Sequence, residues 1–547
     1  MKFNVQTIDW YAVRRVGSIK MKTNYYQEFK EDLAEFREIT QKFYRKEITV
    51  PEYKGFSGGF GSYAQRGGER SMLRLRLAGG EIDLEKVKFI ADSIQKYHID
   101  LVHLTTCQTV QLHNLTAKTV CQLVEEAWQC GIITRGGGGD FPRNVMCSPL
   151  SGISADECFD VLPYAKEAGE YLLSFIHKVK LPRKLKVCFS NGAENTVHAT
   201  FRDLGFVAKE NGKFDVYCAG GLGIKPKFGV KVVTDLGPQK VLYVIKTMVD
   251  VFTEHGNYEK RAASRSRFLQ ETLGVEGLQK VFAEKLAQNL AEERLDLTVQ
   301  DIASNDLEAK AAAHKGEERR KDLLENNRIF AQKQEGLYAV AYSPIGGAVA
   351  LDFFERLYFA AKNMEYPQAV KIRLTPEQGM YIVNLTADEA AQILELTKDS
   401  AQSVFERSTA CIGADICQVG IGKSQSVLEA CVTAVRQANL PKDALPAIHI
   451  SGCPSSCSAH QTARIGLRGG IKQTPDGAKP AFAVYDNGSE KLGSEQMGDE
   501  LGVITVEDLP RFFVKLGQRV AEEKISYEEY AAKYPEQIKE IAAEFTA

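Results

Sequence analysis

Alternation of apolar and polar residues marks the first clear element of the chain. The segment 71–77 ends in alternating leucines and arginines, the arginines being Arg74 and Arg76. Because successive side chains of a strand point to opposite faces, this pattern predicts a strand with leucines on one face and both arginines on the other. After a Gly79-Gly80 turn, apolar residues recur at helical spacing over residues 82–97, which predicts an amphipathic helix.

The pattern that follows occurs twice. Two strands over residues 99–115 and a helix over 116–130 are predicted first. The segment 104–117 aligns without gaps to 374–387, and seven of the fourteen positions are identical. This similarity predicts a duplicated strand–turn–helix unit.

The remaining elements are mainly helical. From 283 to 330 the composition shifts to Ala, Glu, Lys and Arg, which predicts a solvated helical connector and a domain boundary. Apolar residues at helical spacing predict further helices over 162–178, 239–254 and 424–439, and two more in the tail from about residue 505.

Composition limits the class of protein. The chain has 547 residues, 44% of them apolar, enough for three or four domains, and its net charge of −2 favours neither nucleic acid nor an anionic membrane. No apolar run reaches the length of about 18 residues that spans a bilayer. The start, Met1 to Asp9, lacks the layout of a secretory signal. We therefore expect a cytoplasmic protein whose twelve cysteines are thiols and metal ligands.

Four cysteines form two short pairs near the C-terminal end. Cys411 and Cys417 are followed after 35 residues by Cys453 and Cys457, giving C-x5-C and C-x3-C. Four thiolates are what a 4Fe-4S cluster requires. A structural zinc site prefers other spacings, and buried structural thiols would explain one pair more easily than two. The spacing favours an iron–sulfur cluster.

Two glycine-rich segments and two lysines need a separate interpretation. The loop Gly136–Gly139 lacks the Gly-Lys-Ser/Thr of a nucleotide loop, and no segment has the setting of a dinucleotide fingerprint. The turn at Gly220 and Gly221 would let the backbone approach a large flat ligand. Lys184 and Lys186 alternate with apolar residues, so a strand would place both on one face. From the residues alone, a solvated edge strand is the simpler interpretation of that pair.

Several motifs resemble one family. Gly452-Cys-Pro-Ser-Ser-Cys457 follows the strand-like segment 447–451 and is preceded by the C-x5-C pair, and the loop ends in Arg143-Asn-Val-Met-Cys147-Ser-Pro149. These strings resemble the sirohaem-dependent sulfite and nitrite reductases. The resemblance implies that Cys411, Cys417, Cys453 and Cys457 bind a 4Fe-4S cluster, with Cys457 also bridging to the sirohaem iron.

The resemblance also implies a substrate site. Arg74, Arg143, Lys184 and Lys186 stand where the family has four basic residues around the substrate, on the distal face of the sirohaem. Two would hold oxyanion oxygens and two would relay protons. The expected contacts to the cofactor come from polar residues and the second glycine turn, namely Gln108, Gln111, His113, Gly220 and Gly221.

One position departs from the family pattern. The family usually has Arg where Cys107 stands and a basic residue where His103 stands, and these contact the haem carboxylates. Here one charge is missing, and an imidazole is only partly charged at neutral pH. Basic residues between Lys260 and Arg267 would compensate, or the cofactor would sit differently. From its residue type alone, Cys107 is predicted to be a small core residue.

The expected fold is α+β with a pseudo-two-fold plan. A duplicated ferredoxin-like repeat domain covers 1–140 and 331–406, and two α/β domains for sirohaem and the iron–sulfur cluster cover 141–330 and 407–547. The expected reaction is the six-electron reduction of sulfite to sulfide, with nitrite to ammonia as the alternative. Electrons would come from a ferredoxin or a flavoprotein. A cluster-bearing electron carrier without catalysis is the hypothesis from another class.

Overall fold

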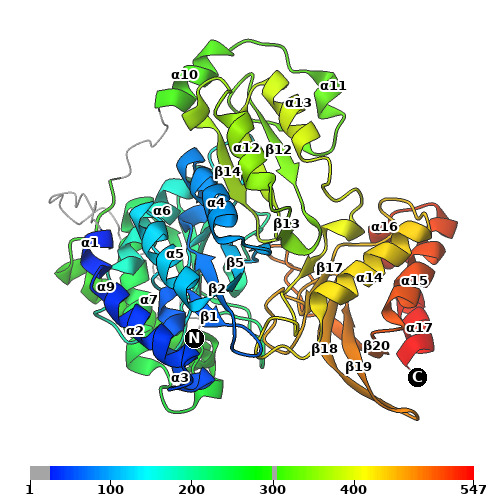
Figure 1. Cartoon of the computed structure of the whole chain (residues 1–547), viewed down its shortest axis with the longest axis horizontal. Coiled ribbons are helices and arrows are strands. Elements are labelled where there is room, and N and C mark those ends of the chain that lie inside the picture. The colour runs from blue at the N-terminus through cyan, green and yellow to red at the C-terminus, as the bar shows by residue number, and fades with distance from the viewer. Residues whose placement is uncertain (1–24, 299–304, 547) are drawn as a thin grey trace.

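The chain folds around four five-stranded sheets. The computed structural model describes residues 25–298 and 305–546, and the four sheets lie within those ranges (Figure 1). The start of the chain, Met1 to Asp9, on which the expectation about a secretory signal rested, lies outside the described residues. Among the described helices, none is both long and apolar enough to cross a bilayer.

Two of the sheets belong to the duplicated unit, and each takes its last strand from the other copy. Strand β13 pairs with β4, and β3 pairs with β14, so the two copies interlock. The first sheet has the order β1 (Ser62–Ala64), β2 (Ser71–Leu75), β5 (Val110–Leu115), β4 (Val102–Leu104) and β13 (Ala348–Val349). The second has the order β11 (Ile329–Ala331), β12 (Tyr338–Tyr342), β15 (Met380–Leu385), β14 (Lys371–Leu374) and β3 (Glu81–Ile82).

The helices of the two copies start in the same way. Helix α5 (Ala117–Gln129) begins after Thr116, and α13 (Ala387–Leu396) begins after Thr386. Each threonine hydroxyl accepts a hydrogen bond from the backbone N–H three residues later, which satisfies a donor that the first turn leaves free. The identities that reveal the repeat therefore include the residues that start its helices.

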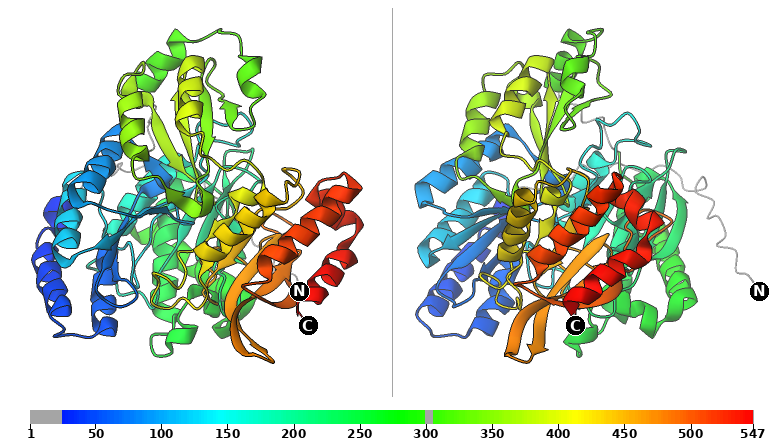
Figure 2. Two further views of the ribbon diagram at one scale, coloured as in Figure 1. Left: turned by 45° about the vertical axis from the view of Figure 1, so that its right-hand side comes forward. Right: turned by 90° about the vertical axis from the view of Figure 1, so that its right-hand side faces the viewer.

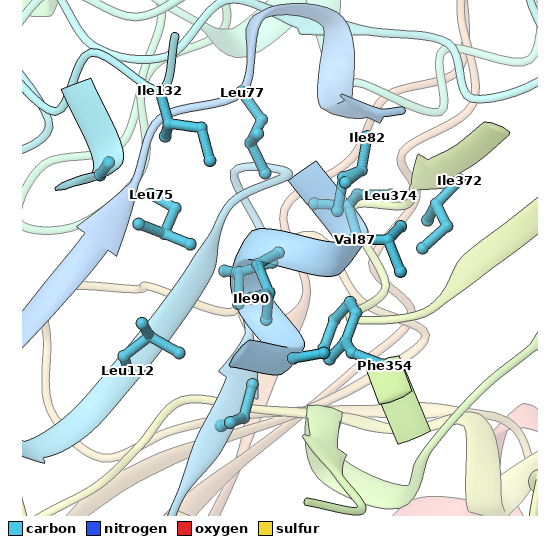
Figure 3. Packing of buried hydrophobic residues seen from close by; sticks show 14 of the residues in the cluster. Leu75, Leu77, Ile82, Val87, Ile90, Leu112, Ile132, Phe354, Ile372 and Leu374 are labelled. Carbon is cyan, nitrogen blue, oxygen red and sulfur yellow. The ribbon is translucent and has the colours of Figure 1, made fainter. Parts of the chain in front are cut away.

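A single core joins the copies. Helix α4 (Leu84–Tyr97) packs against α12 (Phe353–Ala361). Figure 3 shows Val87 and Ile90 of α4 near Phe354 of α12, in one cluster that also contains residues of both sheets. Each fully buried side chain of this size contributes about 1.5–3 kcal/mol. The cluster holds the two sheets together and so fixes the strand ends that carry the site.

The third and fourth sheets share one plan. In each sheet, the first three strands pair in parallel. The fourth strand pairs antiparallel with the third, and the fifth pairs antiparallel with the fourth. The third comprises β6 (Met146–Cys147), β7 (Val187–Ser190), β8 (Leu204–Ala208), β9 (Phe214–Cys218) and β10 (Val230–Leu236). The fourth comprises β16 (Thr409–Ala410), β17 (Ile448–Ser451), β18 (Ile465–Thr474), β19 (Gly477–Asp486) and β20 (Asp499–Thr505).

Helices cover both of these sheets. They are α6 (Leu162–Leu173), α7 (Val241–His255) and α9 (Gly274–Glu292) for the third sheet, and α14 (Ser424–Gln437), α15 (Leu509–Glu523), α16 (Tyr527–Lys533) and α17 (Pro535–Thr546) for the fourth. The tail thus has three helices where two were predicted. The fold is α+β, and the exact domain limits remain predictions.

Several local expectations need correction. The stretch after α9 is not a solvated connector throughout, because Lys310 of α10 (Asn305–Ala313) is 0% exposed and pairs with Glu389 at 2.5 Å. Strand β7 begins at Val187, so Lys184 and Lys186 precede it. The long hairpin of β18 and β19, which extends past the rest of the molecule in Figures 1 and 2, was not predicted, since glycines interrupt its alternation.

Candidate active site

A cavity of about 370 Å³ lies where the repeat sheets meet the third and fourth sheets. Its walls come from β2, from the turn between β4 and β5, from the glycine loop, from the segment before β7 and from the two cysteine loops. Ten predicted site residues line it, namely Arg74, Gln111, His113, Arg143, Lys184, Lys186, Cys411, Cys417, Cys453 and Cys457. Residues more than 300 positions apart are thus brought to one space.

Two arginines are held by backbone carbonyls. Arg74 Nη1 donates to the Gly137 carbonyl at 2.6 Å, and Arg143 donates to the Gly137 and Gly139 carbonyls at 3.2 and 2.7 Å. Arg143 Nε is buried and has no hydrogen-bond partner. Carbonyl oxygens orient a guanidinium without neutralising it, so both side chains keep their full charge toward the cavity.

The lysines enter the cavity from the segment before β7. Leu185 between them forms a bridge with Pro142 and is buried, so the extended backbone sends both ammonium groups to the opposite side. Burial, and then Arg265, Lys186 and Arg143, hold the pKa of Lys184 well below its ordinary value. Burial also lowers the pKa of Lys186, although Cys107 opposes that shift.

None of these four cations pairs with an Asp or Glu carboxylate among the described residues, although Lys186 Nζ lies 3.3 Å from the Cys107 Sγ. This contrasts with Arg265 nearby, which pairs with Asp203 at 3.1 Å. Several positive charges buried without counter-ions are unfavourable unless an anion occupies the space between them. The cavity is therefore an anion site by its charge.

The opposite wall carries the four thiols. Cys411 follows β16 and Cys453 follows β17, so the two parallel strands deliver one cysteine of each pair side by side. Gly452 N–H and the Ser424 hydroxyl lie 3.1 and 3.2 Å from Cys411 Sγ. Within the described residues, no three His, Cys, Asp or Glu side chains converge on a single-ion site.

The thiols and the cations face each other. Burial and the neighbouring Cys411 and Cys453 raise the pKa of Cys457, whereas Lys184 and Lys186 lower it. The Thr106 hydroxyl donates to the Cys457 carbonyl at 2.8 Å. The cysteine expected to bridge the two cofactors thus lies across the cavity from the two lysines.

The histidines of the cavity are uncharged at neutral pH. Burial, then His103 and Arg74, lower the pKa of His113 to about 3, and both of its buried ring nitrogens lack a partner. Burial lowers the pKa of His103 to about 4, and its Nε2 lies 3.0 Å from the Gly346 carbonyl. The partial charge expected for His103 is therefore absent. Gln111 lines the cavity beside them.

Three predicted cofactor contacts lie elsewhere. Gln108 is buried outside the cavity and bonds the backbone of Cys147 and Leu374, so its side chain serves the junction of the two repeats. At Gly220 a Cβ would lie 2.7 Å from Phe201 Cα, so the glycine serves packing within its own segment. Gly221 lines a neighbouring cavity of about 60 Å³, together with Lys184, Lys186 and Cys457.

The expected compensation from residues 260–267 is limited. Arg265 reaches the small cavity but is bound to Asp203, and Arg267 donates to the carbonyls of Ile224 and Lys225. Arg261 pairs with Asp140. Arg265 and Arg261 are thus paired with carboxylates, whereas the carbonyls that hold Arg267 leave its charge unneutralised.

Sequence reasoning missed two residues of the site. Tyr63 lines the cavity, and its hydroxyl accepts a hydrogen bond from Gly139 N–H at 2.6 Å. Burial opposes ionisation of Tyr63, but Arg143 and Arg74 outweigh it and lower the pKa. Arg202 lines the small cavity and donates to the Val197 carbonyl. Tyr63 follows the glycine stretch that precedes β2, which was the one available signal.

Four thiols and four cations without carboxylate partners line one cavity, and this combination is typical of an iron–sulfur oxidoreductase that acts on a small anion. Comparisons with known proteins give the family. Residues 63–127 match the nitrite/sulfite reductase ferredoxin-like half domain, and residues 138–290 match the nitrite and sulphite reductase 4Fe-4S domain. These matches and the relatives below support the nitrite and sulfite reductase family for this chain. Both matched ranges precede the four cysteines.

Individual relatives include both kinds of enzyme. Sulfite reductase [ferredoxin] 1 of Mycolicibacterium paratuberculosis is 25% identical over 79% of this chain and 78% of its own length. A ferredoxin–nitrite reductase of Synechococcus elongatus is 26% identical over 81% and 84%. An assimilatory ferredoxin-dependent nitrite reductase of Haloferax mediterranei is 27% identical over 75% and 72%.

One solved structure shares the fold. The NirA protein of Mycobacterium tuberculosis superposes with a TM-score of 0.71 at 23% identity, covering 91% of this chain and 96% of that one. Both the repeats and the two larger sheets therefore lie within a known architecture.

The cofactors of the family, a sirohaem and a 4Fe-4S cluster, are also those of this chain. The residues present fit these groups. Four thiols line one wall, and buried donors without a partner, on His113 and Arg143, line the same cavity. Sirohaem carries carboxylates, which such donors and unpaired cations suit.

Proposed function

We propose that the chain reduces sulfite to sulfide with six electrons at this cavity. The observation that supports the proposal is the set of four cations without carboxylate partners, which line one cavity together with four thiols. An electron carrier would have no use for such a set, because a cluster alone binds no oxyanion.

Each cation has a distinct role in this proposal. Arg74 and Arg143 hold the oxyanion oxygens, since a guanidinium fixed by carbonyls presents its remaining N–H groups in one orientation. Lys184 and Lys186 donate protons as oxygen leaves as water. The lowered pKa of Lys184 suits this role, because it releases a proton more readily than an ordinary lysine.

The four cysteines would hold the cluster, and Cys457 would bridge it to the sirohaem. When bound, these groups store and deliver the electrons that no side chain can carry. The protein contributes the cations that stabilise negative charge and the protons that replace lost oxygen.

Sulfite is favoured over nitrite by the two lysines. Both Lys184 and Lys186 line the cavity, and the Lys-x-Lys spacing leans toward sulfite because plant-type nitrite reductases often carry Asn at the second position. Nitrite reduction to ammonia at the same site is the alternative, and the names of two relatives support it.

The electron donor in this proposal is a ferredoxin. Sulfite and nitrite reductases named for ferredoxin are among the relatives, and the chain has no fingerprint for a nicotinamide or flavin dinucleotide of its own. Electrons therefore reach the cavity from a separate protein.

A side-by-side assay tests the substrate. We expect kcat/KM for sulfite to exceed that for nitrite when both are measured anaerobically with reduced viologen and the same enzyme. A nitrite preference would reverse the choice of substrate and leave the cofactor sites standing. Turnover of neither anion by protein loaded with both cofactors would contradict reduction of either anion.

A further inference from the structure

The side chain of Cys107 lies beside a proposed catalytic lysine. It is half-buried in the turn between β4 and β5 and lines the main cavity, with Lys186 Nζ 3.3 Å from its Sγ. The turn is held firmly, because Asn144 Nδ2 donates to the Cys107 carbonyl at 3.0 Å and the Thr105 hydroxyl accepts from its N–H at 3.3 Å. Cys107 packs against the small buried cluster that contains Met146 and Cys188, as expected of a core residue, but its side chain also lines the cavity.

The charges around Cys107 are positive. Lys186, Arg202 and Arg74 act on its thiol, and Arg143 is close enough for the thiol to raise the pKa of its guanidinium. The charge of Cys107 also raises the pKa of the buried Cys188 thiol. Burial raises the pKa of Cys107, but Lys186 and the arginines outweigh it and bring the pKa to about 6. The thiol of Cys107 is ionised at neutral pH.

We propose that Cys107 is the anionic partner of Lys186 and acts as a positioning residue that fixes this ammonium in the cavity. The inference deepens the proposed function, on which it rests for the role of Lys186. The same cavity holds His113, which is 1% exposed and has two unpartnered ring nitrogens, so the space beside Cys107 is built to receive a ligand. One negative charge there lowers the net charge of the four-cation site.

A thiolate in this setting is also a nucleophile toward small anionic electrophiles. With iodoacetate, the sulfur of Cys107 forms a bond to the methylene carbon as the carbon–iodine bond breaks and iodide leaves, and no oxidant is needed. The surrounding cations attract the carboxylate of the reagent. Carboxymethylation of Cys107 therefore reports its ionisation without any need for turnover.

The experiment is a pH series of iodoacetate labelling on the anaerobic holoenzyme, read by peptide mass spectrometry. Cys158 is the internal control, since it is also half-buried but burial, Glu210 and Glu157 raise its pKa. We expect the labelling rate of Cys107 to rise with a midpoint near pH 6 and that of Cys158 to rise only at alkaline pH. In Lys186→Gln the midpoint for Cys107 is expected to move up by about one unit or more, and Lys186→Arg is expected to restore it.

Three outcomes would overturn the inference. They are a Cys107 profile that matches Cys158, a profile unchanged in Lys186→Gln, and no labelling of Cys107 in protein where Cys158 reacts. If Lys186→Gln does not fold, the pH dependence of Cys107 labelling in the wild type and in Lys186→Arg, compared with that of Cys158, tests the pair. Labelling depends on the charge pair alone, so a failed sulfite assay with a normal labelling profile would count against the proposed function and not against this pair.

Discussion

Lys184 shows how much of the chemistry rests on single side chains. Its ammonium is buried beside Arg143, Lys186 and Arg265, and these neighbours disfavour the charged form. A lysine with such a lowered pKa loses its proton as pH rises well before an ordinary lysine would. We therefore expect activity that depends on protonated Lys184 to fall on the alkaline side earlier than the usual lysine range.

Replacing this side chain tests the role directly. Lys184→Met keeps the length and removes the charge, so we expect turnover to fall by about 10²–10⁴-fold while the sirohaem absorption spectrum stays the same. Lys178→Met, at an exposed lysine six positions earlier, is the matched control. Unchanged sulfite turnover in Lys184→Met would remove Lys184 from the mechanism.

Single site residues could be predicted from the sequence where the chemistry allows only one or two residue types. Thiols and cations in family-like strings were recognised, and they line one cavity. Gln108 was predicted to contact the cofactor, but it lies outside the cavity. The repeat already indicated another role, because the equivalent residue of the second copy, Gln378, is also a glutamine. A residue present in both copies serves a feature that occurs twice, whereas the substrate cavity occurs once. The glycine stretch before Tyr63 was the one signal for that residue, and Arg202 had none, because only folding brings it to the site.

At the scale of elements, the two glutamines connect the repeats to the larger sheets. Gln108 donates to the carbonyls of Cys147 and Leu374 at 2.7 and 2.6 Å. Gln378 donates to the carbonyls of Leu104 and Ala410 at 3.1 and 3.0 Å and accepts from Ala410 N–H at 2.8 Å. Each glutamine therefore joins one copy to the other and to the first strand of one large sheet.

Loss of this connection should lower stability. Gln378→Leu leaves buried backbone groups without partners, and we expect the apparent free energy of unfolding to fall by roughly 1–3 kcal/mol, seen as a lower Tm. Gln108→Leu should behave alike, since it breaks the equivalent set. Gln368→Leu, at an exposed glutamine of the same repeat, is the control. A Tm for Gln378→Leu equal to that of Gln368→Leu would show that the junction is not stabilising.

Whole elements were predicted best where periodicity was strong. The strand predicted over 110–115 and the helix predicted over 424–439 agree closely with β5 and α14. The hairpin of β18 and β19 was missed because Gly466, Gly469 and Gly470 remove the side chains that would have shown alternation. The swap of β3 and β13 could not be inferred, since two-residue strands leave no pattern.

At the scale of the molecule, the first repeat helps to close the cluster wall. Arg66 follows β1, and its backbone N–H donates to the Ile416 carbonyl at 2.8 Å. Its guanidinium donates to the carbonyls of Cys417 and Gly420 at 3.1 and 2.6 Å. The loop that carries Cys417 is therefore held in part by a residue about 350 positions away, so the first repeat supports the wall.

This contact predicts how firmly the cluster is retained. Arg66→Ala removes the two side-chain hydrogen bonds and leaves every cysteine in place, so the cluster should still assemble under anaerobic conditions. Loss of about 1–2 kcal/mol of loop stabilisation should make opening of the loop roughly tenfold more frequent. We expect iron release to a chelator to be faster by that factor, with Arg70→Ala in the same turn as the control, since no hydrogen bond joins the described Arg70 side chain to this loop. Equal release rates for the two variants would mean that the cysteine loop is held by the fourth sheet alone, and that the repeats contribute cations to the cavity without supporting its thiol wall.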